Sequence, residues 1–347
     1  MKNIRLYIAL VLTTLALSSC EDAEEYGYAK MHTTINSDGS CSREISFNKE
    51  SKHNGIVIDS KWVGSPKNDQ MTTVFYTCNY ENAEQMSQDI PLKFNGKRLQ
   101  SKAKVDKQFR WFYTEYTFTE EFASIGDIFP LPPTLYADAE MVEAWFVGLR
   151  GVGKAMNGSE VMGLLSNMGQ KMDIWLSDNL IHSGMDYIYA HYDFIEKPPV
   201  TREEFMQMRD SLANFLRKQS NGDFLAYDHK KGVQEFFKSN AYDIFFDESD
   251  CAKGMSKHLT PIISFSNLNV PYALTMPGEI VNADNGIYSD GVITYILSGE
   301  RLIPADYTIT ATSRQTNTWA YVVTAIVILL AIGSWVWKLI PKREVKN

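Results

Sequence analysis

Cysteine is scarce in this sequence, and the common catalytic motifs are missing from it. The 347 residues contain 4 cysteines and no C-x-x-C pair, which leaves a thioredoxin-like site or a zinc site of that spacing without support. None of the 6 histidines stands in an H-E-x-x-H pattern, and there is no G-x-S-x-G nucleophile elbow. We therefore assign no catalytic residue, no cofactor and no metal.

Basic residues are outnumbered over most of the chain. Residues 20–317 contain 28 Lys and Arg against 41 Asp and Glu, a formal net charge of about −13. Such a balance argues against nucleic acid, and against anionic lipid headgroups, as the main partner. The stretch is nevertheless long enough to bury a core, or two.

The first twenty residues have the layout of a signal peptide. Lys2 and Arg5 precede an apolar stretch, residues 6–17, which is too short to span a bilayer. Leu17-Ser18-Ser19-Cys20 follows and resembles the lipobox of bacterial lipoproteins. The resemblance implies that residues 1–19 are removed, that Cys20 carries diacylglycerol on its thiol, and that its new amino terminus is acylated, for example with palmitate. A plain signal peptide with a chance cysteine is the alternative.

An acidic run follows Cys20 directly, consisting of Glu21, Asp22, Glu24 and Glu25. It resembles the acidic export tags of surface lipoproteins. The alternative is that residues 20–27 form a solvated tether, which is what charge runs usually are.

The C-terminal part contains a candidate transmembrane helix, residues 317–340. No charge occurs between Arg314 and Lys338, and the 19 residues from Trp319 to Trp337 extend about 28 Å as a helix, close to the hydrocarbon thickness. Aromatic residues stand at both ends of the span, as in the aromatic belts of membrane proteins. A basic tail, residues 341–347, follows.

The charges that flank this helix predict its orientation. By the positive-inside rule the tail is cytoplasmic. Residues 20–316, which include Cys20, are then expected on the other side of the membrane, outside the cytoplasm. Both attachments are therefore expected in one bilayer, with the domain held close against it. In a Gram-negative cell an apolar helix favours the inner membrane, with the domain in the periplasm, because outer-membrane spans are mostly barrels.

Residues 28–125 are predicted to be rich in β-structure. Residues 28–35 and 41–47 flank Asp38-Gly39, a pair suited to a tight hairpin turn, and residues 71–80 form another strand. A second hairpin joins residues 98–105 to residues 109–118. Because the latter strand is aromatic on both faces, we expect both faces to be covered. Three cysteines remain besides Cys20, and they permit one disulfide, which we expect between Cys41 and Cys78, with Cys251 left over.

A helical period extends over residues 126–255, including a capping box at Thr201-Arg-Glu-Glu204 that opens a helix. Residues 256–316 return to β, with short strands expected at residues 262–268, 272–276, 292–297 and 307–312. The sequence thus predicts an α+β fold: an antiparallel β unit formed by the N- and C-terminal parts of the ectodomain, with a helical insertion and one C-terminal transmembrane helix.

Several turns support a resemblance to a family. The Thr34-to-Ser40 hairpin, the Met276-to-Gly286 turn, the Gly291-to-Tyr295 strand and the Thr308-to-Ser313 strand that leads into the final helix resemble LppM-type lipoproteins. These are similarly exported, β-rich and anchored at the C-terminus. The match covers the outer two fifths of the chain, the helical middle departs from it, and the family implies no catalytic residues.

Two motifs suggest ligands but lack essential parts. Gly148 to Ala155 fits G-x-x-x-x-G-K, except that Ala155 replaces the Ser or Thr that holds magnesium, and the preceding residues are predicted to be helical. Asp247, Glu248 and Asp250 form an acidic cluster without the spacing of a calcium loop. We interpret both as ordinary turns.

The aromatic strand at residues 109–118 and the Met-rich helix at residues 156–172 are candidates to line a pocket for an apolar ligand, or simply to form core. The leading hypothesis is a non-enzymatic binding or scaffold module of the envelope, whose partner is an envelope protein or an apolar ligand. The alternatives are an envelope hydrolase with a site that sequence does not reveal, and a structural spacer.

Overall fold

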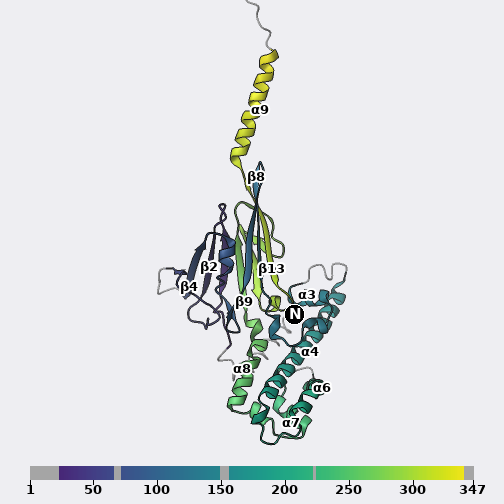
Figure 1. The fold of residues 1–347 in the computed structure, drawn as a ribbon. Coiled ribbons are helices and arrows are strands. Elements are labelled where there is room, and N and C mark those ends of the chain that lie inside the picture. The colour runs from purple at the N-terminus through teal and green to yellow at the C-terminus, as the bar shows by residue number, and fades with distance from the viewer. Residues whose placement is uncertain (1–22, 66–71, 149–155, 222–223, 340–347) are drawn as a thin grey trace, which may run out of the picture.

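The computed structural model of the chain describes residues 23–65, 72–148, 156–221 and 224–339. A β-sandwich carries a helical unit at one end, and a single helix, α9 (Thr318–Leu339), projects from the other end (Figure 1). This confirms the predicted α+β class with one apolar C-terminal helix. The signal peptide at residues 1–19, Cys20 and the basic tail at residues 341–347 lie outside the described residues.

Two sheets form the sandwich. The larger has the order β11-β12-β9-β1-β2-β4-β3, the smaller has the order β10-β13-β8-β7, and β5 and β6 form a separate hairpin. Among the described strands, β1 and β9 pair in parallel and the other pairs are antiparallel. The strands are β1 (Lys30–Ile35), β2 (Cys41–Asn48), β3 (Val63–Gly64), β4 (Thr73–Tyr80), β5 (Lys93–Phe94), β6 (Lys97–Arg98), β7 (Ser101–Phe109), β8 (Tyr113–Phe122), β9 (Asn269–Thr275), β10 (Glu279–Asn282), β11 (Ile287–Ser289), β12 (Val292–Ser298) and β13 (Tyr307–Thr316).

Both halves of the ectodomain contribute to each sheet. In the larger sheet β1 lies beside β9, and in the smaller sheet β8 pairs with β13 over ten residues, from Tyr113↔Thr316 to Phe122↔Tyr307. Alternate residues of β8, β9 and β13 are buried, as expected for strands with one face on a core. The predicted β unit built from both ends of the ectodomain is confirmed.

A buried ion pair joins the two sheets. The Arg43 guanidinium on β2 lies 2.7 Å from the Glu120 carboxylate on β8, and neither side chain is exposed. Tyr272 of β9 donates a 2.7 Å hydrogen bond to the same carboxylate. Ser101 of β7 donates to its second oxygen, also at 2.7 Å. The carboxylate is therefore satisfied by groups from both sheets, as a buried charge requires.

Six α-helices of the helical unit lie within the described residues. A capping box at Asn157 begins the longest, α4, and a second at Thr201 begins α5, as predicted. One core cluster of the unit includes Trp175, and a second includes Phe205, with α4 passing through both. The helices are α3 (Ala139–Phe146), α4 (Gly158–Ala190), α5 (Arg202–Gln207), α6 (Arg209–Ser220), α7 (His229–Phe237) and α8 (Asp250–Ser264); α2 (Ala83–Ser87) belongs to the sandwich.

The strand predicted at residues 262–268 is wrong, because α8 continues through this region and a short 3-10 turn follows it. Ile262 and Ile263 have strand-like propensity, but Ile262 is buried in the helical core, and this packing decides the local structure. The hairpins at β1–β2 and β7–β8 are confirmed. In the first hairpin turn Gly39 has a positive φ, of 99°.

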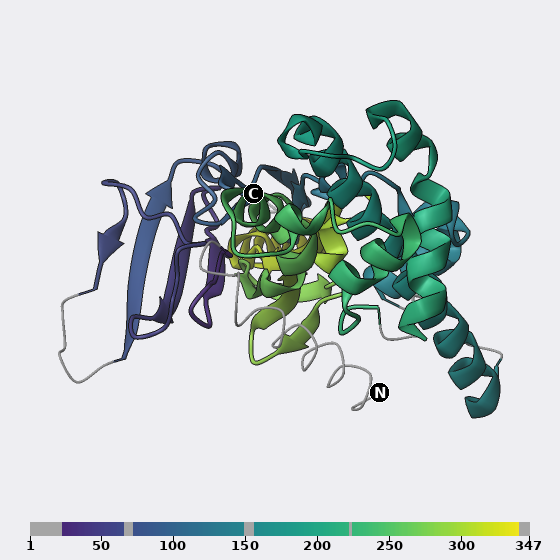
Figure 2. The same cartoon turned by 90° about the horizontal axis from the view of Figure 1, so that it is seen from below.

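The helical unit lies at the end of the sandwich opposite α9. It is entered after β8 ends at Phe122, and it packs through Ile125 and Ile303, next to the far ends of β8 and β13. Seen from this end, the purple and blue strands lie on one side and the teal helices on the other (Figure 2).

Replacing Glu120 with Ala should destabilise the sandwich strongly. The substitution leaves the Arg43 charge buried without its partner, which costs about 3–5 kcal/mol in the free energy of unfolding. Glu115, on the same strand, pairs with the half-exposed Arg314, and E115A should cost less than about 1 kcal/mol. Urea unfolding of the full chain in detergent measures both, and equal losses would contradict the role of the buried pair.

Candidate functional site

The phosphate-loop-like motif is preceded by a helix. Residues 149–155 lie outside the described residues, but α3 ends at Phe146, directly before the motif. A phosphate-binding loop leaves a buried strand instead. The structure thus gives the motif the wrong context for nucleotide binding.

The three cysteines among the described residues are free thiols. Cys41 and Cys78 lie on paired strands, but the register sets Cys41 opposite Tyr80 and Arg43 opposite Cys78. The predicted Cys41–Cys78 disulfide is therefore not formed, and Cys251 is also free. Burial raises the pKa of the Cys41 thiol to about 11, which makes it a poor nucleophile.

The two acidic segments have ordinary structural partners. Asp247 pairs with Lys230 at 2.6 Å, and Asp250 begins α8 next to the Ser249 cap. Residues 23–27 are not a loose tether, because the Glu24 carboxylate accepts the backbone amides of Asn95 and Gly96 at 2.5 and 2.8 Å. Among the residues that the structure describes, no group of three or more His, Cys, Asp or Glu side chains is placed to hold a metal ion.

The two segments that were candidates to line an apolar pocket, or simply to form core, are not brought together. Tyr116 and Phe118 of the aromatic strand lie in the sandwich core, whereas Met172 of the Met-rich helix lies in the helical core. The structure has instead an open groove of about 870 Å³ beside β3 and β4. Its walls mix charged, polar and apolar groups, including Lys61, Cys78, Tyr80, Gln88 and Asp89.

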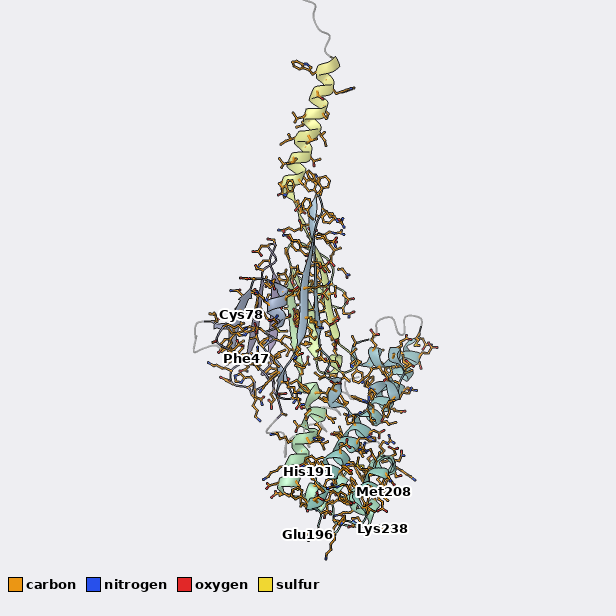
Figure 3. All side chains as sticks on the ribbon, in the orientation of Figure 1. Phe47, Cys78, His191, Glu196, Met208 and Lys238 are labelled. Carbon is orange, nitrogen blue, oxygen red and sulfur yellow. The ribbon has the colours of Figure 1, made fainter. Side chains whose placement is uncertain are left out.

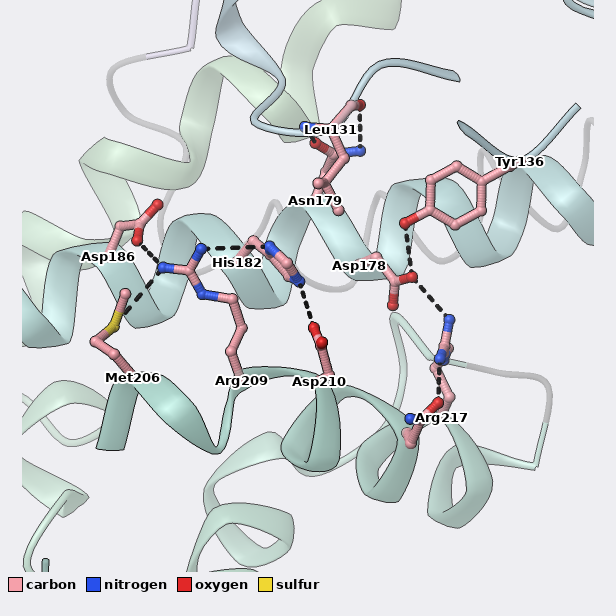
Figure 4. Close-up of polar contacts among 11 residues, drawn as sticks. Leu131, Tyr136, Asp178, Asn179, His182, Asp186, Met206, Arg209, Asp210 and Arg217 are labelled. Atoms are coloured by element: carbon pink, nitrogen blue, oxygen red, sulfur yellow. Dashed lines mark hydrogen bonds and ion pairs between the residues drawn. The ribbon is translucent and has the colours of Figure 1, made fainter. Parts of the chain in front are cut away.

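A row of polar contacts connects α4 to α6 inside the helical unit (Figure 4). Asp178 accepts from Tyr136 at 2.7 Å and from Arg217 at 2.8 Å. One turn further along α4, His182 lies between Arg209 and Asp210, and Arg209 also pairs with Asp186. Burial, and next the Arg209 charge, lower the pKa of His182, while Asp178, Asp210 and Asp186 act in the opposite direction.

Asn317 connects the sandwich to α9. Its side-chain amide donates to the carbonyls of Arg110 and Trp111, at 2.9 and 3.3 Å, in the turn of the β7–β8 hairpin. Its backbone N–H donates to the Phe112 carbonyl at 2.9 Å, and its side-chain oxygen accepts from Thr114 at 3.1 Å. These contacts fix the direction in which α9 leaves the sheet, along the strands (Figure 1).

The first described residues lie far from α9. Tyr26 bonds to Lys93 and Gly27 to Asn48, the last residue of β2, at the end of the sandwich away from the β7–β8 turn. β8 alone is ten residues, or about 30 Å, long, whereas the three residues from Cys20 to Ala23 extend at most about 11 Å. While residues 23–27 keep these contacts and the sandwich stands on α9, a lipid on Cys20 does not reach the bilayer around α9. The expectation of two attachments in one bilayer therefore stays a prediction, and it requires residues 23–27 to leave these contacts.

The helical unit exposes aromatic side chains, beside a partly buried arginine that pairs with Asp193, at its end away from α9, where His191 and Glu196 lie (Figure 3). Tyr189 and Phe194 are exposed, Phe194 by 58%, and the Phe194 ring stacks on His191 with centroids 6.0 Å apart. The Arg202 guanidinium lies 5.5 Å from the centre of the Tyr189 ring. We call Tyr189, His191, Phe194 and Arg202 the distal aromatic surface. No periodic pattern in the sequence points to this surface, because its residues come from a helix end, a 3-10 turn and the next helix.

Comparison of the chain with protein-family models, with curated proteins and with solved structures found no match. The resemblance to LppM-type lipoproteins and the lipobox at Cys20 stay predictions. The distal aromatic surface is the candidate site, because its residue types are those that bind proteins: tyrosine, arginine and exposed aromatic rings.

Lowering the pH should decrease the thermodynamic stability of the helical unit. The pKa of His182 is lowered from 6.5 in the folded chain, so the unfolded state takes up its proton first as the pH falls. The free energy of unfolding should therefore fall as the pH drops below about 6.5. His182→Asn should flatten this dependence in part, since burial also lowers the pKa of His229. Urea unfolding at pH 7.5 and 5.5 measures the slope, and identical slopes in both proteins would contradict the assignment.

Proposed function

We propose that the protein is a membrane-anchored, non-enzymatic binding or scaffold module of the bacterial envelope that presents its helical unit to a partner protein. Helix α9 spans the membrane, which in a Gram-negative cell is the inner one. The ectodomain faces the periplasm, and the tail after α9 is cytoplasmic. Cys20 carries a lipid in this proposal, as the lipobox predicts, and that lipid enters the bilayer around α9 only when residues 23–27 leave their contacts with Asn95, Gly96 and Asn48.

The placement of the distal aromatic surface carries this proposal. The 20 residues from Thr318 to Trp337 have a mean hydropathy of 2.1 and are almost entirely exposed, which supports a bilayer rather than protein as their surroundings. A scaffold standing on this helix holds the helical unit away from the lipid. Exposed aromatic rings beside an arginine at that end suit recognition of another protein.

A photocrosslinking amino acid in place of Phe194 should capture a discrete partner protein in intact cells. The matched control is the same amino acid at Val63, which is 72% exposed, more than Phe194, but lies on the edge strand of the sandwich. Adducts of defined mass should appear on irradiation at position 194 and not at position 63, and substituting Tyr189 and Arg202 should weaken them. The same adducts at both positions, or none at either, would contradict the proposal.

A further inference from the structure

The turn of the β7–β8 hairpin carries large apolar side chains that the sandwich does not cover. Phe109, Trp111 and Phe112 are 59%, 46% and 39% exposed, and Arg110 stands between them. We call residues 109–112 the hairpin tip. The prediction that this aromatic strand is covered on both faces is thus wrong at its beginning, although Tyr116 and Phe118 are buried. Three exposed aromatic rings on one turn indicate a surface that contacts something other than water.

The hairpin tip packs along the first turns of α9. The Trp111 indole N–H donates to the Thr324 hydroxyl at 2.8 Å, and its ring meets Trp319 edge-on with centroids 5.4 Å apart. The rings of Phe112 and Tyr321 are 4.8 Å apart, and Ala320 is completely buried. The tip therefore follows the helix for more than one turn beyond its start.

These contacts place the hairpin tip beside the apolar span of α9, further along the helix than Trp319, the residue at which the span begins. Thr324 is five residues beyond Trp319, or about 8 Å further along the helix axis. The span from Trp319 to Trp337 is about 28 Å long, so it has almost no length to spare when it crosses about 30 Å of hydrocarbon. A bilayer that encloses this span must also meet Trp111 and Phe112.

The carbonyl groups of the turn already have hydrogen-bond donors, as that depth requires. An unsatisfied polar group costs several kcal/mol in lipid. Asn317 provides donors to the carbonyls of Arg110, Trp111 and Phe112, and the Arg110 N–H donates to the Tyr113 carbonyl at 2.8 Å. Arginine at this position can extend its charged end to the headgroups while its stem stays among apolar groups.

We propose that the hairpin tip inserts into the headgroup and upper acyl region of the same bilayer that α9 spans, as a second membrane contact of the ectodomain. This inference rests on the proposed membrane span of α9. The occupant of the surface is phospholipid: the rings of Phe109, Trp111 and Phe112 contact its upper acyl chains, and Arg110 contacts a phosphate. A β-hairpin inserted beside α9 fixes both the distance of the ectodomain from the bilayer and its rotation about the membrane normal.

Quenching of tryptophan fluorescence by brominated lipid tests this contact. The full chain is reconstituted in phosphatidylcholine vesicles whose acyl chains carry bromine near the headgroup, and wild type is compared with W111F, W335F and W145F. Trp335 lies near the far end of α9, and Trp145 lies on α3 in the helical unit. W111F and W335F should each lower the fraction of the emission that the lipid quenches. W145F should raise that fraction, because it removes an emitter remote from the bilayer.

The results distinguish a failure of the tip to insert from a failure of α9 to span the bilayer. If W111F behaves as W145F does while W335F still lowers the quenched fraction, α9 spans the bilayer and the tip stays outside it, which overturns the inference. If W335F also behaves as W145F does, the membrane span itself is refuted. Phe112→Trp supplies an independent check, because a tryptophan added at the tip should raise the lipid-quenched fraction. An added emission quenched by aqueous acrylamide alone would count against insertion.

Discussion

Arg43 and Glu120 form an ion pair between sheets whose strands come from both ends of the ectodomain. A buried pair of this kind contributes little net stability compared with apolar residues, but its loss on one side is costly. The geometry also leaves the Glu120 side chain little freedom to move, since Tyr272 and Ser101 bind the same carboxylate. The pair therefore fixes how the two sheets lie against each other, while the ten-residue pairing of β8 with β13 places the β7–β8 turn beside the start of α9.

Local signals in the sequence were sufficient for much of the fold. The apolar span of α9, the Thr201 capping box and the two hairpins each depend on residues close together in the chain, and all are present. The course of residues 262–268 was not predictable in this way, because tertiary packing of Ile262 overrides a strand-like composition. The parallel β1–β9 pair likewise joins segments more than two hundred residues apart.

The candidate site could not be predicted from sequence patterns, because it too depends on tertiary packing. The distal aromatic surface assembles from residues on different elements, and its exposure depends on how α4 and α5 pack. The aromatic residues at 109–112 were visible in the sequence, yet their environment was not, because only the contact with α9 shows which of them face outward. Glu24 similarly read as part of a solvated run, although the amides at Asn95 and Gly96 bind it.

In the described structure the strands of the sandwich run in the direction of α9, and residues 23–27 lie near the far end of the sandwich. The most direct test is a structure of the full chain in a lipid nanodisc. We expect the β8 and β13 strands to run close to the bilayer normal, with residues 109–112 inside the disc. The far end of the helical unit should lie about 50 Å from its surface, given the lengths of β8 and α8. A sandwich lying flat, with Ala23 against the lipid, would contradict this account.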